Sequence, residues 1–279
     1  MYEPIFVPKM KNHVLSLGGT RFLATHSSEY RSPDDMLDEP LHIHAQTEIF
    51  FLVEGCVSFF VSDRLRKISV GDIVISRANE VHRCICESAG IFDHYCLWID
   101  SMDPSELLGF LCGEDAPTVL SFDIAERERI LSIFKRLAKE REVYDPLEET
   151  CDLLSLISAI KNKGTKKGRE AALPKAMSDV LDDINENYTT LKNLSELTER
   201  HFISSATLSR WFREHLQVSP REYIESKKLS HALRLLLSGT SVTDACMLSG
   251  FSDCSHFIML FKKKFGQTPL KYKETHRQI

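Results

Sequence analysis

The chain has 279 residues, of which 43% are hydrophobic, and this length fits two ordinary domains better than one. Its net charge is −5, and no apolar run approaches the roughly 18 residues that a membrane-spanning helix requires. The first residues lack the charged and then apolar layout of a secretory signal, so we expect a cytoplasmic protein without a membrane partner.

The eight cysteines are expected to be reduced thiols. They form no Cys-x-x-Cys pair, they lie mostly within apolar patterns, and a chain of this size that is not exported does not need disulfides. Most of them are therefore small core residues, and a disulfide or a thiol sensor stays open as the alternative.

Residues 1–105 have the pattern of a β domain. Short runs of aromatic and β-branched residues alternate with turn signals. These runs cover residues 50–53, 57–61, 73–75 and 95–99. Many short strands at close spacing predict a sandwich or a barrel.

Four polar residues of this β domain are candidate ligands. His42 and His44 are two residues apart and share one face of a strand, and Glu48 keeps that parity if the strand is unbroken. His82 follows further along the chain. Three imidazoles and one carboxylate suit Fe, Mn, Ni or Zn. A buried cluster of this kind is costly without a partner, so we expect a ligand or hydrogen bonds to satisfy it.

Residues 106–160 change to a helical period. Apolar residues recur at the spacing i, i+3, i+4, i+7 in two segments, at 130–137 and 153–160. The apolar stripe of these amphipathic helices could pack against the β domain or form a dimer interface.

Residues 161–172 are polar, basic and glycine-containing, which predicts a flexible linker, with incidental phosphate contact as the alternative. The charge is unevenly divided around it. Residues 1–160 hold 15 basic and 27 acidic side chains, whereas residues 171–279 hold 15 and 12. This division favours the C-terminal part as the one that faces a polyanion.

Residues 173–279 are predicted to be helical and contain an internal repeat. The segment 208–213 is followed by Ser219-Pro220, and the segment 257–262 by Thr268-Pro269, at the same spacing. Each follows a short capped helix, at 194–200 and 242–249, and a tight turn. This is the helix-turn-helix layout, repeated on the two sides of a connecting helix at 219–238. Two recognition helices on one rigid connector can enter successive major grooves, roughly 34 Å apart.

Residues 173–273 resemble the AraC/XylS family of bacterial transcription regulators. The most specific stretch runs from Gly250-Phe251-Ser252-Asp253 to Gly266-Gln267-Thr268-Pro269. The resemblance implies a multidomain α+β chain with four parts. These are a cupin-like, effector-sensing β-barrel at 1–105, a helical dimerisation segment at 106–160, the linker at 161–172 and an all-α DNA-binding domain with two helix-turn-helix motifs at 173–279.

The resemblance also implies which residues meet DNA. The first recognition helix covers about 204–214, with Leu208 and Phe212 packed inward, and the second covers about 253–265. The expected DNA-binding residues are Ser204, Ser205, Ala206, Ser209, Arg210, Ser252, Cys254, Ser255, His256, Met259, Lys262 and Lys263. Arg210 is the main candidate for reading guanine, with a phosphate contact or a surface ion pair as the alternative. Lys262 and Lys263 are assigned to phosphates.

Three residues depart from the family pattern in this region. Met259 stands where the family often has arginine, which predicts weaker base reading by the second helix. Gln217 replaces the usual glycine after the first recognition helix, and Cys246 replaces the usual alanine in the second motif.

The pattern His42-x-His44, Glu48 and His82 resembles the cupin motifs, except that Arg77 stands where proline is usual. In regulators of this family the layout implies a pocket for a small organic effector. A metal-containing sensor, a structural remnant and a metallo-cupin enzyme fused to a DNA-binding tail stay open. We therefore predict a regulator, not an enzyme, with no resident cofactor. Its expected partners are double-stranded promoter DNA, a small-molecule effector, RNA polymerase and a second copy in a homodimer, and the resemblance favours an activator.

Overall fold

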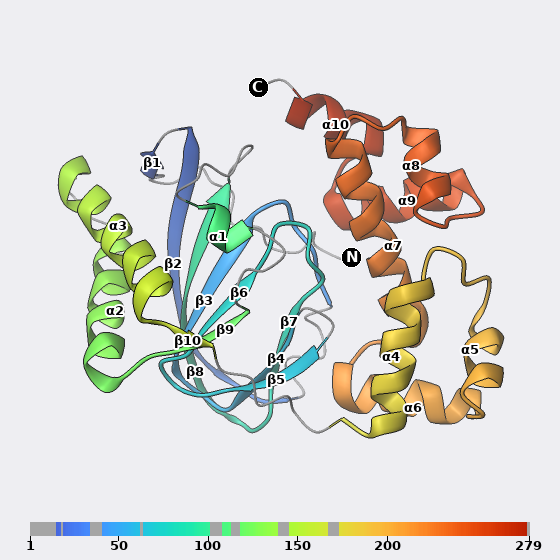
Figure 1. Ribbon diagram of the computed structural model, residues 1–279, viewed down its shortest axis with the longest axis horizontal. Coiled ribbons are helices and arrows are strands. Elements are labelled where there is room, and N and C mark those ends of the chain that lie inside the picture. The colour runs from blue at the N-terminus through green and yellow to red at the C-terminus, as the bar shows by residue number, and fades with distance from the viewer. Residues whose placement is uncertain are drawn as a thin grey trace.

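A computed structural model describes residues 15–17, 19–33, 41–61, 64–100, 108–112, 118–138, 145–166 and 173–277. Figure 1 shows a β-rich N-terminal part, flanked by two helices on its outer side, beside a C-terminal part built of helices. This arrangement confirms the predicted α+β class.

The N-terminal strands form two antiparallel sheets. In spatial order, the larger sheet contains β1 (Leu15–Leu17), β2 (Thr20–Arg31), β8 (Gly90–Asp100), β3 (Thr47–Glu54), β6 (Ile73–Ser76), β9 (Val119–Ser121) and β10 (Thr165–Lys166). The smaller sheet contains β5 (Arg64–Ile68), β4 (Val57–Val61) and β7 (Arg83–Cys86). The four runs predicted to be strands are β3, β4, β6 and β8.

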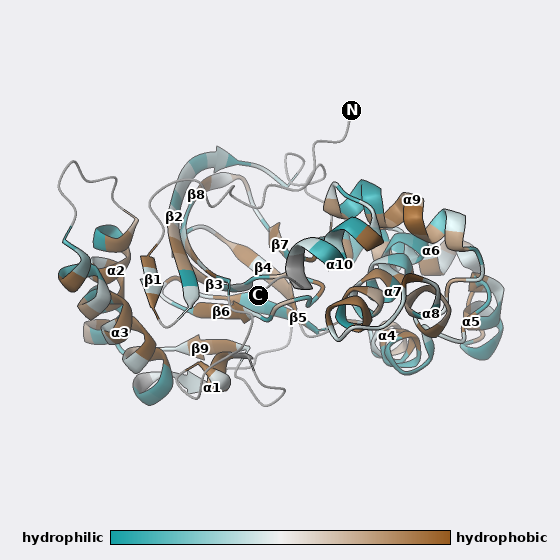
Figure 2. Cartoon of the chain, turned by 90° about the horizontal axis from the view of Figure 1, so that it is seen from above, coloured by the Kyte–Doolittle hydropathy of each residue, from teal (hydrophilic) through white to brown (hydrophobic). Residues whose placement is uncertain are grey.

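The larger sheet is covered on both faces, which explains why β3 is apolar without interruption. Alternate residues of a strand point to opposite faces. Phe50 and Leu52 belong to the core inside the barrel, whereas Ile49 and Phe51 belong to the core beneath the flanking helices. Apolar residues therefore line the strands and the inner sides of these helices (Figure 2).

The flanking helices are α2 (Ile124–Leu137) and α3 (Pro146–Lys163), preceded by the short α1 (Gly109–Cys112). Asp123 and Asp145 cap α2 and α3 through their side chains. The predicted apolar stripe is buried here against the barrel, with Phe134 stacked on Phe51. The same stripe is therefore not open to a second chain, and a dimer would have to use another surface.

The N-terminal unit extends beyond the expected boundary at residue 105. Strand β9 pairs with β6, and β10 pairs with β9, so both belong to the barrel sheet. The expected linker is also partly ordered, because α3 continues to Lys163 and Thr165–Lys166 form β10. Residues 167–172 of that linker lie outside the described residues.

The C-terminal helices are α4 (Lys175–Asn187), α5 (Leu194–Arg200), α6 (Ser205–Leu216), α7 (Pro220–Leu237), α8 (Val242–Leu248), α9 (Cys254–Phe265) and α10 (Pro269–Arg277). The pairs α5–α6 and α8–α9 are the two predicted helix-turn-helix units, and α7 connects them. Side-chain caps start three of these helices: Asn193 and Ser241 cap α5 and α8, and Ser219 forms a full capping box with Glu222.

The turn of the second unit needs glycine at position 250. Gly250 has a φ of +87°, and a methyl group there would lie 2.2 Å from the carbonyl oxygen of Thr189. The absence of a side chain therefore lets this turn pack directly on the segment between α4 and α5.

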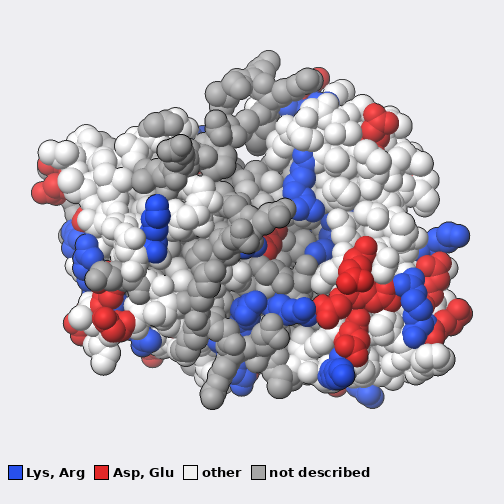
Figure 3. Space-filling model, viewed as in Figure 1, with Lys and Arg blue, Asp and Glu red and all other residues white. Residues whose placement is uncertain are grey.

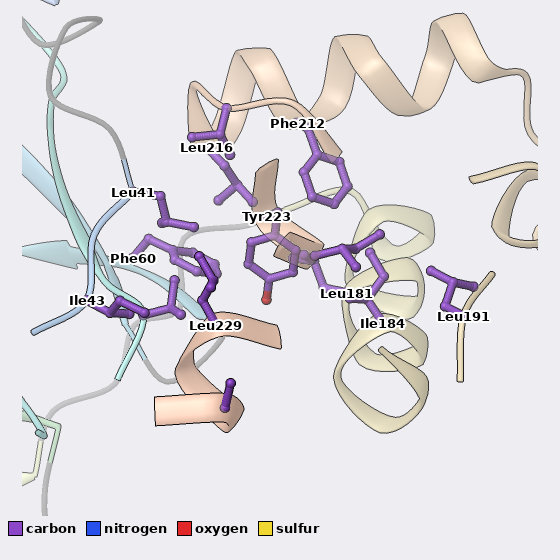
Figure 4. Packing of buried hydrophobic residues seen from close by; sticks show 14 of the residues in the cluster. Leu41, Ile43, Phe60, Leu181, Ile184, Leu191, Phe212, Leu216, Tyr223 and Leu229 are labelled. Atoms are coloured by element: carbon purple, nitrogen blue, oxygen red, sulfur yellow. The ribbon is translucent and has the colours of Figure 1, made fainter. Parts of the chain in front are cut away.

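The two parts of the molecule share one hydrophobic core. Leu41, Ile43 and Phe60 from the barrel pack against Leu216 and Tyr223 from the C-terminal helices (Figure 4). The rings of Phe60 and Tyr223 are 5.7 Å apart, edge to face. The barrel is thus docked onto the helical domain through apolar contact.

Candidate histidine cluster and DNA-contact surface

The four candidate ligands converge at one point of the barrel. The donor atoms of His42, His44, Glu48 and His82 all lie within 4.8 Å of one another. His42 and His82 are joined by two backbone hydrogen bonds of 3.0 Å, and Glu48 is the second residue of β3. The condition for Glu48 to share the parity of His42 and His44, an unbroken strand, is not met, because β3 begins only at Thr47. The backbone bridge between His42 and His82 adds the third histidine to the cluster.

Hydrogen bonds fix the orientation of two imidazoles. His44 Nδ1 lies 2.8 Å from the carbonyl oxygen of Gln46, and His82 Nδ1 lies 2.8 Å from that of Glu80. A carbonyl only accepts, so each Nδ1 carries the proton and donates it. In a neutral ring Nε2 is then an unprotonated acceptor. Both Nε2 atoms face one oxygen of Glu48, at 3.2 Å and 3.3 Å.

Burial and mutual contacts shift pKa values within the cluster. Burial lowers the pKa of His44 and, together with its histidine neighbours, lowers that of His42 well below the usual value. Burial alone would raise the pKa of Glu48, but the contacts with His44 and His82 outweigh it and hold that pKa well below its usual range. A charged carboxylate and three imidazoles thus share one buried site.

A single divalent metal ion would satisfy this donor set. Nitrogen and carboxylate ligands bind transition metals at about 2.1 Å, so donors of one ion lie at most about 4.2 Å apart. The observed spread of 4.8 Å therefore needs only a small contraction. Imidazoles that ligate metals almost always donate the other ring N–H, often to a backbone carbonyl, as His44 and His82 do here. The residues present fit such an ion.

The surroundings of the cluster are aromatic. Trp98 and Phe59 have ring centroids 4.8 Å from His44 and 6.3 Å from His82, respectively. His94 of β8 stacks on Phe50 and on Phe92, and burial lowers its pKa to about 4. Its Nδ1 is buried without a hydrogen-bond partner among the described residues.

The first recognition helix presents the predicted residues to solvent. Leu208 and Phe212 of α6 are buried, as predicted, and Ser204 caps the helix by accepting from the Thr207 N–H. Ser204, Ser205, Ala206, Ser209 and Arg210 are exposed. Within the described part of the chain, Arg210 makes a single loose ion pair, with Glu214 at 4.0 Å. Their contact with DNA stays a prediction.

The second recognition helix is less uniform. Phe257 and Phe261 of α9 are buried, while Cys254 and His256 are half-buried. The remaining predicted residues are exposed, and Met259 retains 59% of its accessible surface. The exposed residues are Ser252, Ser255, Met259, Lys262 and Lys263.

Charge on the helical domain differs between its faces. Figure 3 shows acidic side chains gathered over α4, which carries Asp179, Asp182, Asp183 and Glu186. This patch would repel phosphates. The three consecutive lysines Lys262–Lys264 lie instead in the last turn of α9.

A cleft of about 480 Å³ lies between the two helix-turn-helix units. Its lining includes Asn193 at the start of α5 and Ser252 in the second turn, with Lys228 of α7 between them. Lys228 donates to the carbonyl of Gly250 at 2.7 Å and to that of Leu191 at 3.4 Å. Sequence reasoning missed this lysine, whose position on α7 carries no motif.

Polar contacts also join the barrel to both recognition helices. The buried Arg83 donates to the carbonyls of Leu216 and Gln217, and to the Gln217 side-chain oxygen at 2.8 Å. Lys264 of α9 donates to the carbonyl of Leu41, and burial lowers its pKa to about 8.

Two further contacts lie on other helices. Ser230 of α7 donates to the carbonyl of Asn79, and Arg64 pairs with Asp182 at 2.8 Å. Sequence reasoning missed all of these contacts, because each joins residues more than a hundred positions apart.

Sequence comparisons agree with this two-part organisation. The Helix-turn-helix domain family matches residues 197–275, and the Cupin domain family matches residues 34–99. The transcriptional activator RhaS of Yersinia pestis is 35% identical over 91 residues, and RhaS of Yersinia pseudotuberculosis is equally similar. The chain therefore carries a helix-turn-helix domain similar to that of AraC-family activators, preceded by a cupin domain.

The chain matches only about a third of the length of the RhaS proteins. Among solved structures, ToxT from Vibrio cholerae is 15% identical, with 91% of this chain and 97% of that chain covered and a TM-score of 0.37. The C-terminal domain of the response regulator yesN from Fusobacterium nucleatum is 31% identical, with 36% and 98% covered and a TM-score of 0.34. None of the described helices is long and apolar enough to span a bilayer.

Proposed function

We propose that this regulator controls transcription in response to a divalent transition-metal ion held by His42, His44, Glu48 and His82. The observation that carries the proposal is the convergence of four donor atoms, from three imidazoles and one buried carboxylate, within 4.8 Å of one another. Such a donor set suits a divalent transition-metal ion. In this proposal the ion acts as a signal, and the protein is an activator that recruits RNA polymerase at its promoter.

The route from the cluster to DNA is short. Leu41, which accepts from Lys264 of α9, precedes His42, and Arg83, which donates at the end of α6, follows His82. His42 is thus adjacent to a residue that contacts the second helix-turn-helix unit, and His82 is adjacent to one that contacts the first. An ion that draws the ligands together shifts both contacts, and its differential affinity for the two arrangements of the domains changes the affinity for DNA.

A small organic effector is the second candidate, because a buried polar atom lacks a partner. His94 Nδ1 lies among aromatic rings without a hydrogen bond to any residue that the structure describes. An unpaired buried polar atom costs about 1–3 kcal/mol, which a polar group of a ligand would recover. Such an effector would occupy the barrel beside the cluster.

The test begins with DNA fragments that the purified protein selects from a random pool. Affinity for a selected fragment is measured by fluorescence anisotropy, on protein stripped with a chelator and then supplied singly with Mn²⁺, Fe²⁺, Ni²⁺ or Zn²⁺. We expect at least one ion to bind at one equivalent per chain and to change the DNA affinity at least fivefold.

Two substitutions in one strand give a matched control. Glu48→Gln removes the charge of the cluster and should abolish both effects, whereas Glu54→Gln alters an exposed residue at the end of β3 and should abolish neither. Stoichiometric binding without any change in DNA affinity would refute metal control. Failure of all four ions to bind would leave the organic effector as the candidate, and a ligand screen by thermal shift on His94→Phe and wild type would test it.

A further inference from the structure

Two cysteines meet at the start of the second recognition helix. Cys246 of α8 and Cys254, the first residue of α9, have their sulfur atoms 2.8 Å apart. A disulfide bond is about 2.05 Å long, so the two sulfurs need to approach by less than one ångström. Cys246 occupies the position where the family usually has alanine, so this pair is not required by the fold.

The two thiols have different surroundings. Cys246 is fully buried, whereas Cys254 is half-buried and reachable by a small oxidant. Burial and the contact with Cys254 raise the pKa of Cys246 to about 12, so Cys246 stays protonated at neutral pH. Cys254 is therefore the thiol that an oxidant reaches and oxidises first. Cys246 then forms the disulfide with the oxidised sulfur of Cys254.

We propose that Cys246 and Cys254 form a peroxide-responsive pair whose conversion to a disulfide weakens DNA binding by the second helix-turn-helix unit. The effect on DNA rests on the proposed function as a DNA-binding regulator. The formation of the disulfide does not.

The chemistry uses one hydrogen peroxide for each disulfide. The sulfur of Cys254 attacks one peroxide oxygen, the O–O bond breaks, and water leaves to give a sulfenic acid. The sulfur of Cys246 then attacks the sulfur of Cys254, the S–S bond forms as the S–OH bond breaks, and the thiol proton leaves with hydroxide as a second water. The two thiols lose two electrons, which reduce the peroxide to two waters.

The disulfide acts on DNA through the position of Cys254. This residue opens α9, next to the exposed Ser252 and Ser255 that are predicted to meet DNA. A bond to α8 turns its side chain away from the groove and ties the first turn of α9 to the preceding helix. We expect oxidation to weaken binding to a selected site about tenfold, the size of one lost base contact, and to leave the part of the site read by α6 unaffected.

The experiment uses the full chain with Cys56→Ser and Cys151→Ser, because these two thiols are exposed and would also react. The protein is treated with one equivalent of hydrogen peroxide, alkylated with N-ethylmaleimide and digested with trypsin. No lysine or arginine lies between positions 235 and 261, so both cysteines fall on one peptide. We expect that peptide to be two hydrogens lighter, without maleimide, and to regain two alkylatable thiols after dithiothreitol.

DNA affinity is measured on the same samples and on two variants. Cys246→Ala should bind DNA like the reduced protein and should not respond to peroxide. Cys254→Ser removes a residue predicted to meet DNA, so its own affinity is the reference for that variant, and peroxide should not change it. Because Met247 and Met259 lie on the same peptide and can gain oxygen, a response that persists in Cys254→Ser would overturn the proposal in favour of methionine oxidation.

Two further outcomes would overturn the proposal. A peptide that keeps two alkylatable thiols after peroxide shows that no pair forms, and a disulfide that leaves DNA affinity unchanged shows that it controls nothing. If the reduced protein binds no DNA at all, the proposed function fails, while the peptide mass still decides whether the thiols pair.

Discussion

The ion pair of Arg210 within its own helix is too weak to stabilise the fold appreciably. Its ion pair with Glu214 spans 4.0 Å between two largely exposed side chains, and surface pairs of this kind contribute at most about 1 kcal/mol. The guanidinium is thus free to turn toward a base, where it can bond guanine at two atoms.

We expect Arg210→Ala to reduce the preference for selected DNA over random DNA by at least tenfold, without a change in thermal stability. Competition binding with both DNAs measures this ratio. Arg210→Lys separates base reading from phosphate contact, because lysine keeps the charge but not the planar pair of donors. Equal selectivity for the lysine variant and the wild type would show that Arg210 holds a phosphate.

Lys262 lies exposed in the last turn of α9, one turn beyond Met259. We expect Lys262→Ala to weaken binding by a similar factor on selected and random DNA, because a phosphate contact carries no sequence information. Binding measured at several salt concentrations should show a logarithmic slope that is smaller by about one. A loss confined to the selected DNA would instead assign Lys262 to a base.

At the scale of elements, the second helix-turn-helix unit depends on the contact between its turn and the segment before α5. Gly250→Ala would place a methyl group 2.2 Å from the Thr189 carbonyl oxygen, in a backbone conformation that disfavours a side chain. We expect the helical domain to lose more than about 3 kcal/mol of stability.

Gly239→Ala is the matched control, because Gly239 also has a positive φ but has no atom within 4 Å of the added methyl. It should cost only about 1–2 kcal/mol. Trp98→Phe leaves Trp211 of α6 as the single tryptophan, so urea unfolding followed by its fluorescence reports on the helical domain. Equal losses for the two variants would show that the close approach to Thr189 contributes nothing.

Local sequence determines the helical elements far better than the ends of the sheet. Asn193, Ser219 and Ser241 mark helix starts by their own side-chain bonds, so the sequence alone predicts the starts of α5, α7 and α8 to the residue. Strands β9 and β10 have three and two residues, which is too short for any period, and only their pairing partners define them. The cluster was predicted through its residue types, but its geometry depends on the bridge between His42 and His82.

At the scale of the whole molecule, the barrel forms hydrogen bonds with the C-terminal ends of both recognition helices, α6 and α9. These long-range contacts also explain why Gln217 can replace the usual glycine after the first recognition helix. Gln217 adopts the left-handed conformation that favours glycine, with a φ of +54°, and its side chain accepts from Arg83. The strain of a non-glycine residue is thus offset by a bond to the other domain.

We expect Lys264→Met to uncouple metal binding from DNA binding. The change lies on α9, so the four cluster residues stay intact and the ion should still bind, while its effect on DNA affinity should fall at least threefold. Anisotropy with and without the ion measures this coupling.

Lys273→Met is the control, because Lys273 bonds the carbonyls of Gly239 and Thr240 inside the helical domain and makes no described contact with the barrel. Full coupling in the Lys264 variant would mean that the signal travels by another route, through Arg83 or the shared apolar core.

The adjacency of Leu41 to His42 and of Arg83 to His82 also restricts how such regulators can be recombined. A chimera that exchanges whole barrels at the segment before α4 would bring in foreign residues at 41 and 83, facing an α9 and an α6 that did not match them. Such a protein would fold and bind both its ligand and its promoter, but the ligand would not change its affinity for DNA. A chimera that responds to its ligand has to include Gln217, Ser230 and Lys264 from the same parent as the barrel. The barrel and its docking residues on the helices therefore have to be exchanged together.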